Sequence, residues 1–151
     1  MNKVTVVGAG LAGCEAAWHL AEQGFQVALC DIKPKAFTPA HSNPDFAELV
    51  CSNSLKSNDV FGNACGLLKQ EMRVLGSLTM AAAEQAAVPA GGALAVDRER
   101  FAHIITQKIK QHKNIEIVCK EVGSVPAAPA IVATGPLTAG ALAEDIASVT
   151  G

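Results

Sequence analysis

The stretch VTVVGAGLAG at residues 4–13 decides the fold of this chain. Its apolar first part is typical of a buried strand, and a helical pattern over residues 11–23 follows it. Gly8 permits a tight turn out of the strand, Gly10 lets a pyrophosphate approach the backbone, and Gly13 lets the helix pack closely. The helix N-terminus is an anion site because its amides are unpaired. The pattern predicts a dinucleotide site made by Gly8, Ala9, Gly10, Leu11, Ala12 and Gly13.

A second apolar run, over residues 26–31, ends at Asp31. In dinucleotide-binding units an acidic residue at this place binds a ribose hydroxyl. Because a carboxylate repels a 2'-phosphate, Asp31 argues against NADP in this pocket. The motif does not distinguish FAD from NAD.

The composition is that of one domain with a hydrophobic core: 151 residues, 50% hydrophobic, with a formal net charge of −2. We find neither a secretory signal nor a membrane-spanning run, so we expect a cytoplasmic protein. The balance of charge gives no sign of a nucleic-acid surface. The local basic stretch of Lys108, Lys110 and Lys113, with His112, is interpreted as the solvated end of a helix.

The five cysteines have neither CxxC pairs nor metal-ligand spacing, so we expect no metal site and no disulfide framework. Cys51 lies in the polar segment FAELVCSNSLKS at residues 46–57 and is the candidate nucleophile. Its thiol would need activation, for which His41, Lys56 and loop amides are candidates. The alternative is a partly buried, inert thiol. For the remaining four we expect core packing: Cys14, Cys30, Cys65 and Cys119.

The remaining patterns predict a doubly wound parallel α/β sheet with an insertion after its second strand. Strands are expected at 3–7, 26–31, 115–119 and 130–133. Helices are expected at 11–23, after a cap at Asp97, and at 138–147. A further helix is expected at 64–86, with an apolar face made by Leu67, Leu68, Met72, Leu75 and Leu78. Residues 32–57, rich in proline, are expected to form a loop. Thr134 and Gly135 follow the last strand, so they, Asp31 and the insertion are expected at one crevice.

Five blocks of the chain resemble the N-terminal part of the TrmFO family, the folate- and FAD-dependent tRNA (uracil-5-)-methyltransferases. They are residues 8–13, 38–41, 46–57, 88–99 and 131–138. The resemblance implies a Rossmann-like, glutathione-reductase-like FAD-binding domain. Residues 1–151 would be a part of it, with an insertion at 32–96 that carries Cys51, and we expect the rest of the parent protein to be absent.

The resemblance also implies an activity: a one-carbon unit from 5,10-methylenetetrahydrofolate is placed on C5 of the T-loop uridine of tRNA. FAD is the implied cofactor, and NAD(P)H the implied source of electrons. Cys51 matches one of two catalytic cysteines, either the one that adds to uracil C6 or the acid/base at C5. Gly8, Gly10, Gly13 and Asp31 match FAD contacts, and Thr134 with Gly135 matches a later turn near the cofactor.

Two other hypotheses about the function stay open. One is the related flavoprotein that modifies the wobble uridine of tRNA, against which the 46–57 block argues. The other is a dinucleotide-binding fragment without turnover. We expect a fragment to expose apolar surface and an open sheet edge, and therefore to self-associate.

Overall fold

The computed structural model describes residues 3–151, and its main element is a four-stranded parallel sheet. The strands are β1 (Lys3–Val7), β2 (Gln26–Asp31), β6 (Ile115–Cys119) and β7 (Ala130–Val132), in the order β6-β2-β1-β7. Each neighbouring pair is parallel, with Val6 beside Leu29 on one side and Ile131 on the other. The predicted doubly wound sheet is confirmed.

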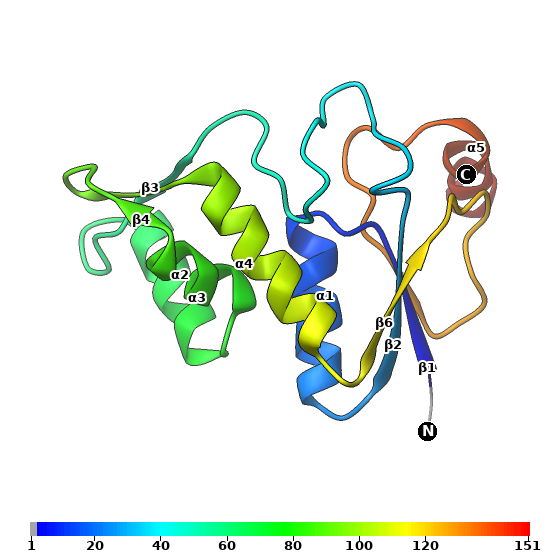
Figure 1. The fold of residues 1–151 in the computed structure, drawn as a ribbon, viewed down its shortest axis with the longest axis horizontal. Coiled ribbons are helices and arrows are strands. Elements are labelled where there is room, and N and C mark those ends of the chain that lie inside the picture. Colours follow the sequence, from blue (N-terminus) through cyan, green and yellow to red (C-terminus); the bar gives the residue numbers. More distant parts are fainter. Residues whose placement is uncertain (1–2) are drawn as a thin grey trace.

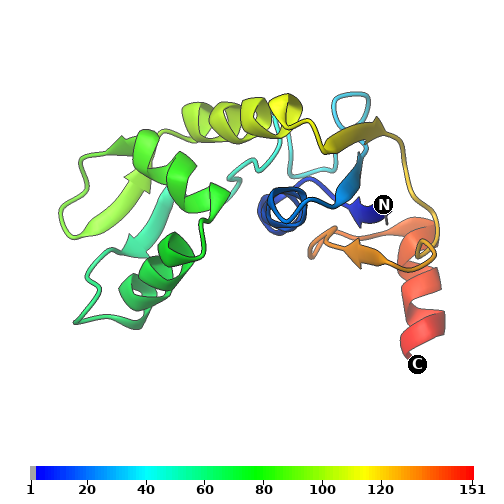
Figure 2. The same cartoon turned by 90° about the horizontal axis from the view of Figure 1, so that it is seen from below.

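Two helices cover one face of this sheet. Figure 2 shows α1 (Leu11–Glu22) and α4 (Arg98–Gln111) on the same side, while the segment that joins β6 to β7 passes on the other. Val6, Leu29, Phe101 and Ile105 are fully buried between these layers. The apolar periodicity of α4 and its Asp97 cap are confirmed, since the Asp97 carboxylate accepts the Arg100 amide at 2.9 Å. The last helix, α5 (Gly140–Thr150), follows β7.

The segment between β2 and α4 contains a second, antiparallel sheet that the sequence patterns did not predict. Its strands are β3 (Ser54–Ser57), β4 (Ala87–Val88) and β5 (Ala93–Val96), in the order β3-β5-β4. It lies beside α2 (Ala64–Val74) and α3 (Leu78–Gln85), away from the parallel sheet (Figure 1). Strands of two to four residues are too short to show a period in the sequence.

The single helix expected at 64–86 is wrong, because the chain forms two helices there. Gly76 has a φ of +73°, which ends α2, and the Ser77 hydroxyl accepts the Met80 amide at 3.1 Å to begin α3. The apolar face expected there, which also included Met72 and Leu78, is wrong for Leu67, Leu68 and Leu75, whereas Leu78 is buried and Met72 packs against the core. A Cβ on Gly66 would overlap the backbone of Asp59, so this bare face packs inward, and Lys69 is buried beside it.

As a result, most of the large apolar side chains of α2 and its flanks point to solvent, with Met72 as the exception. Phe61, Leu67, Leu68, Val74 and Leu75 are all exposed. The α2 region therefore exposes several large apolar side chains.

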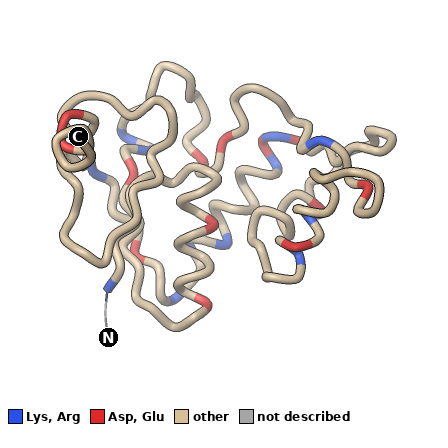
Figure 3. Tube along the Cα trace, turned by 180° about the vertical axis from the view of Figure 1, so that it is seen from behind, with Lys and Arg blue, Asp and Glu red and all other residues tan. Residues whose placement is uncertain are grey.

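The charged residues are mixed over the whole trace (Figure 3). Lys108, Lys110 and Lys113 are exposed at the end of α4, as expected. His112 instead packs edge-on against Trp18 and pairs with Glu22 at 3.0 Å. Within residues 3–151 no helix is both long and apolar enough to cross a membrane.

Candidate dinucleotide site and its cysteine segment

The turn after β1 has the geometry that its three glycines predict. Gly8 has a φ of +98°, and a Cβ there would lie 2.6 Å from the Ala133 carbonyl oxygen. A Cβ on Gly13 would overlap the Gly8 carbonyl oxygen, so α1 can approach the turn only with glycine at this position. Gly10 differs, because nothing lies within 4 Å of the place its Cβ would take. Backbone atoms therefore fill the space beside Gly8 and Gly13, while the space beside Gly10 is free.

The open position coincides with the N-terminus of α1. Gly10 is the N-cap, no described side chain caps the helix, and its first turn contains no acidic residue. Backbone amides and the helix dipole at such a terminus favour an anion. The free space at Gly10 and this terminus together form a cradle suited to a pyrophosphate.

The turn after β7 closes the other side of the glycine turn. The Ala133 amide donates to the Val7 carbonyl at 2.7 Å, and the Thr134 and Thr138 hydroxyls are 2.6 Å apart. Gly135 has a φ of +76°. A Cβ on Gly8 would come too close to backbone atoms of Ala133 and Thr134. The turn after β7 therefore lies against the glycine turn, as expected.

Asp31 ends β2 beside the glycine turn and binds two backbone amides. Its Oδ2 accepts the Ala9 amide at 2.6 Å, and its Oδ1 accepts the Lys33 amide at 2.8 Å. An ionised carboxylate has about four acceptor sites, so capacity remains for a ribose hydroxyl. The acid therefore also orders the turn, which the sequence pattern alone did not indicate.

The other cysteines differ from Cys51 in their surroundings. Cys14 is buried and its thiol donates to the Ala9 carbonyl at 3.3 Å. Burial, reinforced by the carboxylates of Asp31 and Glu15, raises the pKa of Cys14 and keeps it a thiol. Cys30 is buried as expected, whereas Cys65 and Cys119 are half-buried, so core packing describes those two only in part.

Cys51 is exposed, and no described hydrogen bond links it to the expected activating side chains. The His41 ring is 2.6 Å from the Thr38 hydroxyl, and the Lys56 amide donates to the Ser54 hydroxyl at 3.1 Å. Among the described hydrogen bonds and ion pairs, none joins either residue to Cys51. The thiol is thus accessible, and activation by His41, Lys56 or loop amides stays a prediction.

The segment that carries Cys51 is fastened to the glycine turn. The Ala47 amide donates to the Ala9 carbonyl at 2.9 Å, and the Phe46 amide donates to the Thr106 hydroxyl of α4 at 2.8 Å. Phe46 and Ala47 are buried. From this contact the chain rises and crosses toward β3 (Figure 1). The insertion and the dinucleotide turn therefore share one end of the sheet, as predicted.

A buried ion pair holds the same segment from the side. The Lys33 ammonium binds a Glu48 carboxylate oxygen at 2.8 Å and the Asp45 carbonyl at 3.0 Å, and both side chains are about 90% buried, with 9% and 12% exposed. The other Glu48 oxygen accepts the amides of Ser42 and Asn43 at 3.1 and 3.2 Å. Burial works against ionisation of Glu48, but these donors outweigh it and lower its pKa.

We expect Glu48→Gln to lower the free energy of unfolding by roughly 3 kcal/mol at neutral pH, because Lys33 then stays buried without its counter-charge. Since folding lowers the Glu48 pKa, the contribution of the carboxylate is present above its ordinary value of 4.5 and is lost as pH falls through the folded value. Urea unfolding at several pH values checks this. The difference between wild type and variant must shrink on acidification, and a pH-independent difference would contradict the assignment.

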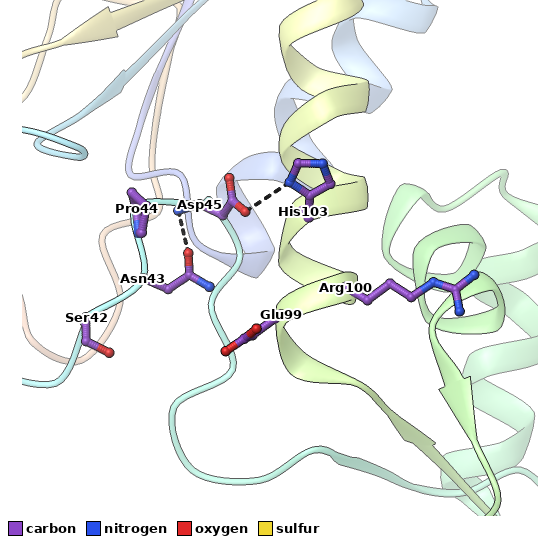
Figure 4. A pocket seen from close by; sticks show the side chains of 7 residues that line it. All are labelled: Ser42, Asn43, Pro44, Asp45, Glu99, Arg100 and His103. Atoms are coloured by element: carbon purple, nitrogen blue, oxygen red, sulfur yellow. Dashed lines mark hydrogen bonds and ion pairs between the residues drawn. The ribbon is translucent and has the colours of Figure 1, made fainter.

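A polar depression of about 610 Å³ lies between this segment and α4 (Figure 4). It is lined by Ser42, Asn43, Pro44, Asp45, Glu99, Arg100 and His103. His103 Nδ1 is 3.4 Å from Asp45 Oδ2, and the Asp45 amide donates to Asn43 Oδ1 at 2.8 Å. Sequence reasoning missed it because its two halves are more than fifty residues apart and carry no shared motif.

Parallel sheet and glycine turn together define a Rossmann-type fold, the class found in dinucleotide-binding proteins. The chain belongs to the GIDA family, described as glucose inhibited division protein A, whose model matches residues 3–146. It is 56% identical over 151 residues to methylenetetrahydrofolate--tRNA-(uracil-5-)-methyltransferase TrmFO of Exiguobacterium sibiricum. The aligned region is all of this chain and 35% of that protein. The TrmFO of Bacillus subtilis is 53% identical over 148 residues, 98% of this chain and 34% of the relative.

These matches confirm the predicted resemblance to TrmFO, and the chain spans about a third of the length of the curated relatives. Solved structures agree on the fold. Aquifex aeolicus GidA superimposes with a TM-score of 0.65 at 19% identity, over 84% of this chain and 21% of that one. The GidA-related protein from Thermus thermophilus gives 0.53 at 14% identity, over 97% and 68%.

Proposed function

We propose that the protein carrying this chain transfers a one-carbon unit from methylenetetrahydrofolate to C5 of a uridine in the T-loop of tRNA. The observation that carries the proposal is the identity of 53–56% along nearly the whole chain to proteins named for that reaction. The structure supports it with an open dinucleotide cradle and an exposed cysteine segment fastened to the same turn.

The residues at the glycine turn fit FAD. Residues 10–13 at the start of α1 would bind the pyrophosphate, because Gly10 leaves room and the helix terminus offers amides. Asp31 would bind the adenosine ribose, and Thr134 with Gly135 would border the cofactor from the other side. When bound, FAD supplies the electrons that reduce the transferred carbon to a methyl group, and NAD(P)H is the proposed reductant.

Cys51 is the proposed catalytic residue of this chain. Uracil C5 becomes nucleophilic when a thiolate bonds to C6, since the electron pair of the C5–C6 double bond then moves toward C5. After the carbon is attached, loss of the C5 proton and cleavage of the C6–sulfur bond restore the double bond and the thiolate. The alternative role for Cys51 is removal of that C5 proton, and the family resemblance is compatible with both.

Location and partners follow from the proposal. The protein would act in the cytoplasm, where its tRNA substrate is present. Self-association of the chain on its own stays a prediction, and the exposed apolar side chains of α2 are the surface that would mediate it.

We expect Gly10→Ala to abolish FAD binding while the fold is kept. The φ of −73° at Gly10 suits alanine and its Cβ meets no protein atom, so the methyl group occupies only the space reserved for the pyrophosphate. The check is the flavin absorbance of purified wild type and variant, with thermal unfolding on added FAD. A ligand at about 100 times its Kd stabilises by roughly 2.7 kcal/mol, so wild type must shift and the variant must not.

The activity itself is tested in a full-length protein that carries these 151 residues. Labelled methylenetetrahydrofolate is supplied with T-loop tRNA and, separately, with the same tRNA in which the target uridine is replaced by cytidine. We expect label in 5-methyluridine of the first tRNA only. Label at the wobble position, or none in either tRNA, would overturn the proposal.

A further inference from the structure

The exposed thiol belongs to a short arch, residues 50–52, whose two ends are held by one structural junction. Val50 is 39% exposed, and Cys51 and Ser52 are exposed beside it. Leu49, just before the arch, is buried and its carbonyl oxygen accepts Arg98 Nη1 at 3.5 Å. At this length the bond is weak, and the buried Leu49 side chain contributes the rest of the upstream anchor.

The downstream anchor is Asn53, which binds the main chain of Val96 twice. Its side-chain Nδ2 donates to the Val96 carbonyl at 3.1 Å, and its own carbonyl accepts the Val96 amide at 2.9 Å. Val96 is fully buried at the end of β5 and immediately precedes the Asp97 cap of α4. This anchor is therefore attached to one of the best-packed points of the chain.

Both anchors reach residues 96–98, where β5 ends and α4 begins. A three-residue arch between two fixed points has little room to move, so Cys51 is held at a defined place near the junction of β5 and α4. A nucleophile needs this, because a misplacement of about 1 Å can reduce a rate roughly 100-fold. Among the described hydrogen bonds, those that hold the arch are made by its flanking residues at this junction.

We propose that Asn53 is a positioning residue for Cys51, with Arg98 as the weaker second anchor. The inference rests on the proposed function, since it concerns the cysteine that acts on uracil. Asn53 need not touch the substrate. Its side-chain amide fixes the end of the arch from which the thiol reaches the base.

The test compares Asn53→Ala with Asn58→Ala in the full-length protein that carries this chain. Asn58 lies in the same insertion, and its side chain accepts only an exposed Arg73 bond, at 2.8 Å, so it is a matched control. For Asn53→Ala we expect kcat per bound flavin to fall roughly 10-fold to 100-fold, with the KM for tRNA and the flavin content unchanged. Asn53→Gln, which keeps an amide donor, should recover part of the rate.

A merely structural Asn53 would give a less stable protein whose kcat per bound flavin equals that of wild type, and this result would overturn the proposal. If Asn53→Ala does not fold, Arg98→Gln is tested instead. It should lower kcat per bound flavin and leave the KM for tRNA unchanged. An unchanged kcat there would count against positioning by the junction. A wild-type protein without tRNA methylation would instead refute the proposed function, and the two failures are therefore distinct.

Discussion

Replacing Cys51 by serine is expected to reduce tRNA methylation by at least about 10³-fold, while the FAD content and the fold stay unchanged. Loss of a nucleophile commonly costs this much or more, since the remaining groups cannot substitute for the missing covalent step. The fold should be retained because Cys51 is exposed, and serine differs from it by one atom. The measurement is single-turnover transfer of labelled carbon to tRNA by the full-length protein.

The matched control is Cys65→Ser, which removes a half-buried thiol at the start of α2 in the same insertion. That variant should keep its methylation rate within about 2-fold, because no described hydrogen bond joins the Cys65 thiol to the glycine turn or to residues 50–52. Turnover in Cys51→Ser at a rate near that of wild type would remove Cys51 from the mechanism. Equal losses in both variants would point to a general effect of thiol replacement.

Gly13→Ala is expected to destabilise the chain by roughly 3 kcal/mol, even though alanine is the better helix former. In an exposed helix interior the change would stabilise by about 1 kcal/mol. Here the added Cβ would overlap the Gly8 carbonyl oxygen, and both partners are backbone atoms that cannot rotate away. Destabilisation by Gly13→Ala would therefore show that the close packing of α1 on the turn outweighs the higher helix propensity of alanine.

Urea unfolding of Gly13→Ala beside Gly10→Ala checks this prediction. Gly10→Ala should unfold at the wild-type urea concentration, because its Cβ meets no atom within 4 Å. A Gly13→Ala protein as stable as wild type would show that α1 can move away from the turn without cost. The two glycines would then not have the separate roles that the geometry gives them.

The elements that the sequence predicted well are those with a strong local signal. The parallel strands at 3–7, 26–31 and 115–119 are apolar runs, and α4 has both an apolar period and a capping aspartate. The helix pair in place of one helix was missed because Gly76 alone could not show whether the chain bends or stops there. The exposure of Leu67 and Leu68 was missed for a different reason, since it depends on Gly66 packing against Asp59, which lies outside the helix.

For the candidate site, the glycine turn and the exposed Cys51 could both be predicted from local sequence. Glycine spacing sets backbone conformation locally, so the roles of Gly8, Gly10 and Gly13 follow from one short stretch of sequence. The groups that surround these residues are known only from the folded chain. The Ala47 bond to Ala9, the buried Lys33 and Glu48 pair and the anchor of Asn53 on Val96 join segments far apart in the chain. No pattern in a linear sequence encodes such contacts, because they exist only when packing brings the segments together and excludes water from between them.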